Sequence, residues 1–530
     1  MLKINGRPGQ VITIRHMEHL INDIPAINSI SFNRPGIFDK YIEYAQKDVF
    51  ICKGGDECFI PKFKYDGFRY AFVEGLEPKQ ATEEALTFLV ISSDVEECGG
   101  FKCSCDILNK LQEMTKRSDI SNFYYFPTDC PQREKNGWTA DAAVSAEQML
   151  LNFDVANSLE VWLENIRMAQ NTDGSIPGII PTGEWGYHYY GPSWDSVCVM
   201  LPYYIYKFKG DKQIIKDNAS MMLRYFYYQK GRYTDDGLID HGLGDWCAPF
   251  KREDNTFLSP RKFTSSVVAY DAAIKAAFLF EEIEQKDEAN YLRSIAEDLK
   301  NNIRNTMIDF DTMTAVGECQ TSQAIAMHYG IFNDNEIEQA SERLKEIIIK
   351  NGYINTCGVI GLRVIYHVLT SVGEYDLAYK LISSDERSCY GSWVKNGATT
   401  LFENFPHEDG REINSQNHHF LGDISSWFIQ DVVGIKPNPN MTDISEFEVS
   451  PHFIKKLDFA KAHFTSGFGK LEVEWKRNAE EIDVKIIVPK GMHGRIKIEN
   501  GYILKNSTTD KLIGGIYQFK ILKTENSMEE

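Results

Sequence analysis

The sequence predicts a mainly α-helical protein, in which an (α/α)6 barrel lies between a short β-rich N-terminal region and a C-terminal β-sandwich. From about residue 100 to about residue 433, apolar residues recur with the 3.6-residue period of amphipathic helices. Before and after this stretch, short apolar runs are typical of β-strands separated by turn residues. The length of 530 residues also agrees with about three domains.

The β-rich N-terminal region is expected to span residues 1–95. Residues 11–14 (VITI) and 68–73 (FRYAFV) are rich in β-branched and aromatic residues, and Gly and Pro separate such runs. The region shows no long helical period. We therefore expect strands here, although the region is small for a complete sandwich.

The barrel is expected to span residues 96–436. Twelve helices in consecutive hairpins can close as six inner and six outer helices. An open helical solenoid is the alternative, but no self-similar repeat at a fixed period supports it. Long stretches between the helices, such as 121–140 and 385–417, are typical of functional loops. The twelve apolar-periodic segments lie near 104–117, 141–152, 156–170, 195–208, 211–230, 265–284, 287–306, 321–330, 335–351, 361–372, 375–384 and 418–433.

The C-terminal β-sandwich is expected to span residues 437–530. Leu471, Val473 and Trp475 alternate with charged residues, and residues 482–488 repeat this pattern. Strict alternation indicates strands with one buried and one exposed face. Turn residues between the runs favour an antiparallel arrangement.

Composition and charge exclude some classes of function. A net charge of −19 without a dense Lys/Arg run argues against nucleic-acid binding, because phosphates would be repelled. The sequence shows neither a secretory signal nor an apolar window of roughly 20 residues, so no membrane partner is expected. Eleven cysteines, an odd number, favour free thiols in a reducing cytoplasm over disulfides. Cys98, Cys103 and Cys105 are close together, but without a nearby His or a second pair they favour buried thiols over a metal site.

Residues 129–141 combine groups that are unfavourable in a protein core. They read DCPQREKNGWTAD and include three carboxylates, an arginine and a tryptophan, while Pro131 and Gly137 oppose a regular helix. Unpaired charges are costly to bury, but they suit a cleft that binds a polar ligand and transfers a proton to it. A second candidate acid, Glu403, lies in GATTLFE at 397–403. Two carboxylates from distant segments that face one bond are typical of glycoside hydrolysis.

These residues resemble a known family. The DCPQREKNGWTAD segment is similar to the signature of the glycoside hydrolase family 78 α-L-rhamnosidases, as are GATTLFE at 397–403 and NHHFLG at 417–422. The similarity extends from about residue 50, through GFRY at 67–70, to about residue 500. The DCPQR block is its most specific part, and the other segments support it.

The resemblance implies roles for individual residues. Glu134 is the expected general acid, which protonates the leaving glycosidic oxygen, and Glu403 is the expected general base, which activates water. Because the family inverts the anomeric configuration, the two carboxyl groups should lie roughly 6.5–9.5 Å apart. Asp129 and Asp141 would raise the pKa of Glu134, and Arg133 would oppose this. The expected substrate-binding residues are Asp129, Arg133, Trp138, Asp141, Trp194, Trp246 and His418.

Structural roles stay open for the same residues. Glu134 and Asp129 could form a salt-bridged loop with Arg133, and Glu403 could be a helix-capping or solvated acid. Residues between helices often only pack, cap or anchor a loop, which applies to Trp194, Trp246, His418, His419, Asp195 and Asp245.

Three positions beside the expected base depart from the family pattern. Phe402 stands where the family usually has Trp, and Asn404 and Phe405 stand where Arg and Trp are common. A phenyl ring keeps an apolar wall but lacks the indole donor, so the preference for the leaving group is expected to differ.

The leading hypothesis is an inverting α-L-rhamnosidase that cleaves terminal rhamnose from small rhamnosides or oligosaccharides in the cytoplasm. No metal or organic cofactor is expected, because two carboxylates with suitable pKa values suffice for this reaction. Homo-oligomerisation stays open. The alternatives are an (α/α)6 glycosidase for another sugar and a non-catalytic carbohydrate-binding protein.

Overall fold

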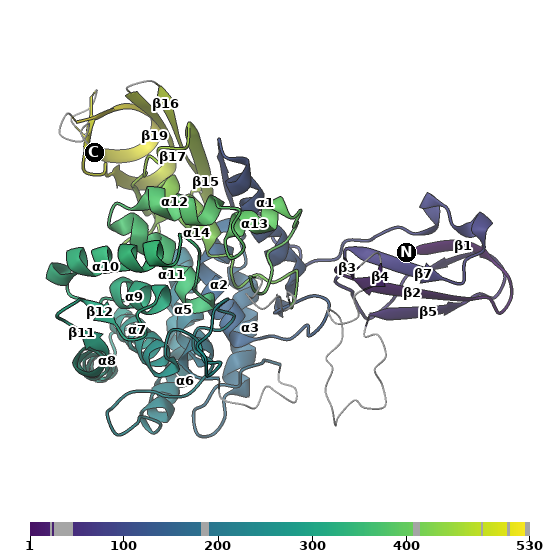
Figure 1. Cartoon of the computed structure of the whole chain (residues 1–530), viewed down its shortest axis with the longest axis horizontal. Helices are drawn as coiled ribbons and strands as arrows, with labels where there is room; N and C mark the ends of the chain where they lie inside the picture. Colours follow the sequence, from purple (N-terminus) through teal and green to yellow (C-terminus); the bar gives the residue numbers. More distant parts are fainter. Residues whose placement is uncertain are drawn as a thin grey trace.

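Helices occupy the middle of the chain and strands occupy both ends (Figure 1), as the sequence predicts. The computed structural model describes residues 1–21, 24–25, 46–181, 190–405, 414–478, 481–505 and 509–524. The N-terminal strands extend from one side of the helical barrel, and the C-terminal sheet lies against another edge of it.

The N-terminal region consists of short antiparallel strands around a small apolar core. Side chains alternate between the two faces of a strand, so that Leu2, Ile4, Ile12 and Ile14 form the core together with Cys52. One sheet has the order β5-β2-β7, while β1 pairs with β6 and β3 pairs with β4. The elements are β1 (Leu2–Gly6), β2 (Val11–Met17), β3 (Leu20–Ile21), β4 (Ile24–Pro25), β5 (Lys47–Ile51), β6 (Gly55–Phe59), β7 (Tyr70–Glu74) and the 3-10 helices η2 (Pro78–Gln80) and η3 (Glu83–Ala85).

Six helices that are buried on most sides form the inner ring of the described part of the barrel. Small residues allow close packing here: Ala269, Ala272, Ala273 and Ala276 of α7 are all buried. The inner helices are α2 (Thr139–Asn152), α5 (Val197–Lys209), α7 (Arg261–Glu282), α9 (Gln320–His328), α11 (Val359–Ser371) and α14 (Ile424–Trp427), which continues as the π-helix η5 (Phe428–Val432).

Six amphipathic helices form the outer ring of the same described barrel. In α8, Leu292, Ala296, Leu299 and Ile303 recur every three or four residues and are buried, because they face the inner ring. The closed ring of helical hairpins is the predicted arrangement. The outer helices are α1 (Asp106–Ser121), α3 (Ala156–Ala169), α6 (Gln213–Lys230), α8 (Lys286–Met307), α10 (Ile337–Lys350, preceded by the 3-10 helix η4, Asp334–Glu336) and α12 (Tyr375–Ser383).

Several element boundaries differ from the sequence-based expectation. The expected helix at 195–208 is divided into α4 (Pro192–Asp195) and α5, and the sequence does not predict α13 (Tyr390–Lys395). The expected helix at 418–433 begins only at Ile424, because the backbone N of His418 donates instead to Leu401 O (2.9 Å). Two short hairpins join helices: β9 (Phe123–Tyr124) with β10 (Phe126–Pro127), and β11 (Ile308–Asp309) with β12 (Thr314–Ala315).

The C-terminal region forms one curved sheet of eight strands (Figure 1). Its hydrogen bonds join all the described strands in the order β13-β14-β17-β16-β15-β8, with β19 beside β17 and β18 beside β19. The pairing is antiparallel except between β14 and β17. The sheet also includes β8 (Gly99–Cys103), which pairs with β15. This strand precedes the barrel helices in sequence and lies within the range expected for the barrel. The other strands are β13 (Ile435–Pro437), β14 (Glu446–Val449), β15 (Phe459–Ser466), β16 (Gly469–Asn478), β17 (Glu481–Ile496), β18 (Tyr502–Leu504) and β19 (Lys511–Lys523).

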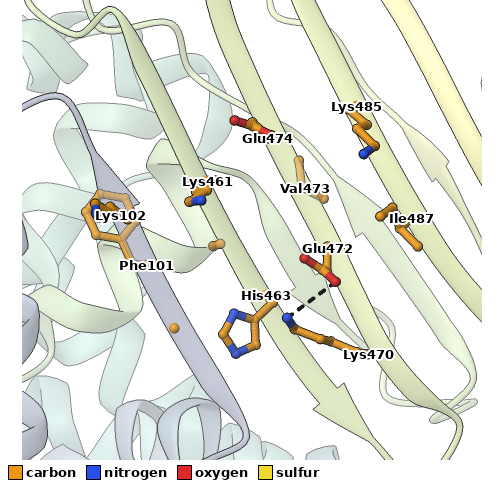
Figure 2. Close-up of a pocket in the computed structure, with 12 residues that line it drawn as sticks. Phe101, Lys102, Lys461, His463, Lys470, Glu472, Val473, Glu474, Lys485 and Ile487 are labelled. Carbon is orange, nitrogen blue, oxygen red and sulfur yellow. Dashed lines mark ion pairs between the residues drawn. The ribbon is translucent and has the colours of Figure 1, made fainter.

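The strands of this sheet carry a pocket of about 360 Å³ (Figure 2). Side chains of β8, β15, β16 and β17 line it, and Lys470 Nζ lies 3.3 Å from Glu472 Oε1. The residues lining this pocket include none of the acids or aromatics expected to act on a substrate.

Among the described helices, only α7 is long and apolar enough to cross a membrane. Of its most apolar stretch, 78% is buried inside the barrel. Its apolar residues therefore belong to the protein core.

Candidate active site

Glu134 lies in a loop between β10 and α2 that closes on itself. Asp129 joins the two ends of the loop, because its backbone N donates to Asn136 O (3.0 Å) and its Oδ1 accepts from Asn136 N (2.8 Å). The backbone N of Lys135 donates to Cys130 O (3.1 Å), and a positive φ of 56° at Lys135 turns the chain. The loop is thus a tight, non-helical turn that presents Glu134, as its composition predicts.

Glu403 lies in a segment that is held between α1 and residues 415–418. Leu401 N donates to Ser118 Oγ of α1 (2.8 Å). On the other side, Glu403 N donates to Ser415 O (2.9 Å), and His418 N donates to Leu401 O (2.9 Å). These contacts fix the backbone on both sides of Glu403, which is buried and lies outside any described helix.

Arg133 brings the two acids together. Its Nη2 lies 2.8 Å from Glu403 Oε2 and 3.6 Å from Glu134 Oε1, and the three side chains keep only 9–11% of their surface exposed. Because both oxygens contact one nitrogen, they cannot be further apart than the sum of these distances. These two oxygens are therefore closer together than the lower end of the roughly 6.5–9.5 Å range expected for an inverting pair.

The surroundings of Glu134 favour its protonated form. Burial raises the pKa of Glu134 and the charge of Glu403 adds to this, while Trp138 and Arg133 oppose it. Trp138 Nε1 donates to Glu134 Oε2 (2.7 Å). The pKa of Glu134 is raised overall, and a general acid needs a raised pKa to be protonated near neutral pH. The largest cause is burial, rather than the charges of Asp129 and Asp141 that the sequence suggests.

Asp129 anchors the loop that carries Glu134, called the acid loop below. It is buried, and its two oxygens accept hydrogen bonds from Asn136 N and from Cys130 Sγ (2.8 Å each). Burial, followed by the charge of Glu134, raises the pKa of Asp129 well above its usual value. A loop-anchoring role for Asp129 is therefore present in the structure, and its contact with a sugar hydroxyl stays a prediction.

His418 and Asp141 form a buried pair beside the acids. His418 Nε2 lies 2.9 Å from Asp141 Oδ1, at the start of α2. Burial lowers the pKa of His418, but Asp141 more than offsets this and raises it to about 9. The ring is therefore protonated near neutral pH. Its Nδ1 is a buried donor with no hydrogen-bond partner among the described residues, so it can bind a ligand oxygen.

The neighbouring His419 has a structural role. Its Nδ1 lies 2.9 Å from Ser145 Oγ and its Nε2 lies 3.0 Å from Thr128 O, so it links α2 to the acid loop. Burial lowers the pKa of His419 to about 4, which keeps the ring neutral. Of the two adjacent histidines, His418 is thus the one available to a substrate.

Two of the three candidate tryptophans belong to one aromatic wall. Tyr190 packs edge-on against Trp138 (ring centroids 5.0 Å apart) and tilts against Trp194 (6.5 Å). Trp194 is 3% exposed, whereas Trp246 is 37% exposed and packs edge-on against Phe257. The ring of Trp246 thus packs on Phe257, and its contact with a substrate stays a prediction.

The loop that carries Trp246 nevertheless lies near the site. Burial raises the pKa of the next residue, Cys247, and Glu403 and Asp141 contribute to the shift. Asp245 anchors this loop to α11: it accepts from the backbone N of Gly358, Ile360 and Gly361 and from Thr321 Oγ1. Asp245 is thus a helix-terminus anchor, one of the alternatives that the sequence leaves open.

Sequence reasoning misses a buried acid, Glu18, that comes from the N-terminal region. Glu18 Oε2 accepts from Gln132 Nε2 (2.9 Å) and from the backbone N of Gln416 (2.9 Å). Gln132 Nε2 also lies 3.0 Å from Ser415 Oγ. The available signal is that Glu18 follows an apolar strand directly, but the sequence does not reveal partners more than 100 positions away.

Two groups of described residues place possible metal-ligating atoms close together: Asp129, Cys130 and His418, and His16, Asp48 and Asp66. In the first group, burial keeps the Cys130 thiol protonated by raising its pKa, and His418 is paired as a cation with Asp141. In the second group, Lys64 Nζ already lies 2.8 Å from Asp48 Oδ1 and 3.2 Å from Asp66 Oδ2. Both groups thus carry protons or an ammonium group where a cation would bind.

Three models of one enzyme family match consecutive parts of the chain. The bacterial α-L-rhamnosidase six-hairpin glycosidase domain matches residues 96–432, which include Glu134 and Glu403. The chain belongs to the bacterial α-L-rhamnosidase family. The concanavalin-like domain of this family matches residues 1–92, and its C-terminal domain matches residues 444–505.

Curated α-L-rhamnosidases are related along most of the chain. One from Formosa agariphila is 28% identical over 479 residues, which cover 84% of this chain and 48% of the relative. One from an Alteromonas species is 26% identical over 557 residues, which cover 99% of this chain and 58% of the relative. The chain therefore spans about half the length of the curated relatives it matches.

Solved α-L-rhamnosidases share the fold. The structure from Dictyoglomus thermophilum matches with a TM-score of 0.87 and 26% identity, over 98% of this chain and 60% of that one. The Streptomyces avermitilis α-L-rhamnosidase complexed with L-rhamnose matches with a TM-score of 0.86 and 23% identity, over 98% of this chain and 50% of that one. The six-hairpin barrel with flanking β regions is thus the fold of this family.

Proposed function

We propose that the chain hydrolyses terminal α-L-rhamnose from small rhamnosides with inversion of the anomeric configuration. The observation that carries this proposal is the contact of both Glu134 and Glu403 with Arg133, although Arg133 and Glu403 are 270 positions apart. Membership of the family supports rhamnose as the sugar, and inversion is what the family resemblance implies.

Glu134 is the proposed proton donor to the leaving oxygen. Trp138 occupies its Oε2, so Oε1 is the oxygen left to carry the proton. Burial raises the pKa of Glu134, which keeps this proton in place until the glycosidic oxygen accepts it.

Glu403 is the proposed base for the attacking water. Arg133 orients its carboxylate by the 2.8 Å contact. Since the guanidinium lies between the two acids, water must approach Glu403 beside Arg133 and share the carboxylate with it. Because these two oxygens are closer than in an inverting pair, the proposal requires the two carboxyl groups to move apart when a substrate binds between them.

The groups around the acids suit a deoxy sugar. The protonated His418 and its partner Asp141 offer charge-assisted hydrogen bonds to sugar hydroxyls. Trp138, Tyr190 and Trp194 form an apolar wall that suits the methyl group of rhamnose. We propose the remaining predicted binding residues, Asp129, Arg133 and Trp246, as further contacts.

The residues beside Glu403 that depart from the family pattern support a preference for the leaving group that differs from that of the family. Phe402 packs against Trp393 (ring centroids 5.3 Å apart), and Trp393 stacks on Phe405 (4.5 Å). Asn404 Nδ2 donates to Phe405 O, so Asn404 stabilises the backbone in place of the family's usual arginine. Phe402 and Trp393 line one pocket with Arg69, Arg387 and Lys395, and we expect this surface to set the preference for the leaving group.

We also propose that the protein works in a reducing compartment such as the cytoplasm. All eleven cysteines are free thiols, and most of them are buried. Persistent free thiols are usual where thioredoxin and glutathione keep cysteine reduced.

The test compares Glu134→Gln and Glu403→Gln on two α-L-rhamnosides that differ in leaving group. Loss of the acid should lower kcat/KM about 10²–10⁴-fold for a poor leaving group such as an alkoxide, and far less for dinitrophenolate, which needs no proton. Loss of the base should lower kcat/KM for both substrates. The exposed Glu253→Gln is the matched control and should behave as wild type.

Full activity of either variant on the alkyl rhamnoside would remove that residue from its role. A panel of other aryl glycosides tests the sugar, because turnover of another sugar with rhamnoside inert would overturn rhamnosidase activity. Binding of rhamnose without turnover at any pH would instead indicate a carbohydrate-binding protein.

A further inference from the structure

The buried acid Glu18 stands outside the proposed acid–base pair, yet it contacts the segments that carry both members. It follows β2 in the N-terminal region and is only 5% exposed. A carboxyl group so far from water is costly unless it is hydrogen-bonded or protonated. Its position therefore calls for a function.

Glu18 contacts both the segment that carries Glu134 and the segment that follows Glu403. Its Oε2 accepts from Gln132 Nε2 (2.9 Å), two residues before Glu134, and from the backbone N of Gln416 (2.9 Å). Gln416 follows Ser415, whose carbonyl accepts from the backbone N of Glu403 (2.9 Å). One oxygen of Glu18 is thus hydrogen-bonded both to the loop that carries Glu134 and to the segment that is bonded to the backbone of Glu403.

A second contact closes this network. Gln132 Nε2 lies 3.0 Å from Ser415 Oγ, so the same amide group touches both Glu18 and the segment beside the base. Gln132 and Ser415 are both buried. Displacing Glu18 would remove one hydrogen bond from Gln132 and one from the backbone of Gln416, and would leave the two catalytic segments joined by fewer contacts.

We propose that Glu18 is a positioning residue, through which the N-terminal β region fixes the distance between the loop that carries Glu134 and the segment that carries Glu403. This inference rests on the proposed function of Glu134 and Glu403. Glu18 acts through Gln132 and the backbone of Gln416, and it needs no contact with the sugar.

The protonation state of Glu18 gives the proposal a pH signature. Burial raises the pKa of Glu18 to about 8, with a contribution from Glu403, while Gln416, Arg133 and His418 oppose the shift. At neutral pH Glu18 is mainly neutral and adds no charge beside Glu403. Above about pH 8 it ionises and competes with Glu403 for Arg133, so kcat should decline as it does so.

The experiment measures kcat and KM on an aryl α-L-rhamnoside, together with thermal unfolding, for Glu18→Ala, Glu18→Gln and Glu18→Asp. Glu18→Ala should lower kcat at pH 7 by at least about tenfold with little change in KM, because misplacement of a catalytic group mainly slows the chemical step. Glu18→Gln should stay within about threefold of wild type, since its amide oxygen can accept the same two hydrogen bonds. Glu83→Ala, an exposed acid of the same region, is the control and should be unchanged.

Two further readouts separate positioning from a general loss of stability. Above pH 8, kcat should decline less in Glu18→Gln than in wild type, because the part of the decline that comes from ionisation of Glu18 is removed. The kcat losses of Glu18→Ala and Gln132→Ala should also not add in the double variant, because both remove one connection. Simple destabilisation would move neither the pH profile nor this coupling.

A wild-type kcat for Glu18→Ala, or strictly additive losses with Gln132→Ala, would overturn the inference. If Glu18→Ala does not fold, Glu18→Asp decides the question: its shorter side chain cannot reach both partners, so wild-type kcat there would overturn it equally. A wild-type protein that is inert on α-L-rhamnosides would instead contradict the proposed function.

Discussion

At the residue scale, the site depends on one cation shared between two acids. Arg133 contacts Glu403 at 2.8 Å and Glu134 at 3.6 Å, and its charge opposes a rise in the pKa of Glu134. Burial counteracts this at Glu134 and raises its pKa. The protonated form that a general acid needs is therefore favoured at Glu134 by burial, against the opposing effects of Trp138 and Arg133.

A single indole hydrogen bond tunes the acid and can be tested. Trp138 Nε1 donates to Glu134 Oε2 and lowers its pKa, so Trp138→Phe should raise the pKa of Glu134 further. Because the acid works protonated, the alkaline limb of kcat/KM should move to higher pH. Trp194→Phe, whose indole packs against Tyr190, is the control and should leave the limb in place. An alkaline limb that stays or moves to lower pH in Trp138→Phe would contradict this account.

Residues that are adjacent in sequence could be predicted, and those joined only by folding could not. Arg133, Glu134 and Trp138 stand in one short, unusual segment, and the structure brings them together. Glu18 lies in an ordinary strand-like stretch, and nothing local shows that it reaches Gln132. The different roles of His418 and His419 likewise depend on Asp141 and Ser145, which belong to α2 and are distant in sequence.

At the element scale, a partly buried, charged histidine connects α11 to the last inner helical segment. His367 of α11 pairs with Asp423 (2.9 Å) and with Asp431. Burial lowers the pKa of His367, but the two carboxylates more than offset this and raise it to about 10. The pair joins neighbouring members of the inner ring.

This histidine predicts a pH-dependent contribution to stability. The folded-state pKa of about 10 lies above the ordinary value of 6.5, so the contribution is complete below about pH 6.5 and is lost as the pH rises through 10. Breaking a buried ion pair typically costs about 3–5 kcal/mol. His367→Gln should therefore unfold more readily than wild type in urea at pH 6, with the difference shrinking toward pH 10.5. A difference that is constant across this range would contradict the pairing.

The helices of the barrel could be predicted because their apolar periods are long. Segment 418–423 could not, since its apolar residues also fit a helix while its backbone bonds to the segment that carries Glu403. The tertiary pairing of His418 N with Leu401 O overrides the local pattern. The pairing of β8 could not be predicted either, because a run of five residues does not indicate a partner strand more than 350 positions away.

At the scale of the whole molecule, the N-terminal region is in direct contact with the catalytic loop. Lys135 Nζ donates to Tyr65 O (2.7 Å). Gln46 holds Gly67 by two hydrogen bonds of 2.8 Å, one to each backbone group. A Cβ at Gly67 would meet Pro131 atoms at 2.6–2.7 Å, so the two regions approach too closely for any larger residue. The β-rich region thus forms part of the site's framework.

This close approach predicts the effect of one methyl group. Gly67→Ala should force Pro131 and the acid loop apart, lowering kcat and costing about 1–3 kcal/mol in stability, the usual range for overpacking. Gly467→Ala, whose Cβ would have no neighbour within 4 Å, is the matched control. Rates and unfolding are measured on both variants. Equal behaviour of the two would show that this contact does not hold the loop.

The most direct test of the central claim is the anomer formed first. Proton NMR on wild type acting on an aryl α-L-rhamnoside, recorded before mutarotation, should show β-L-rhamnose, because Glu403 directs water to the face opposite the group that Glu134 protonates. First appearance of α-L-rhamnose would mean that the two acids do not work by single displacement, and would contradict the roles assigned to them.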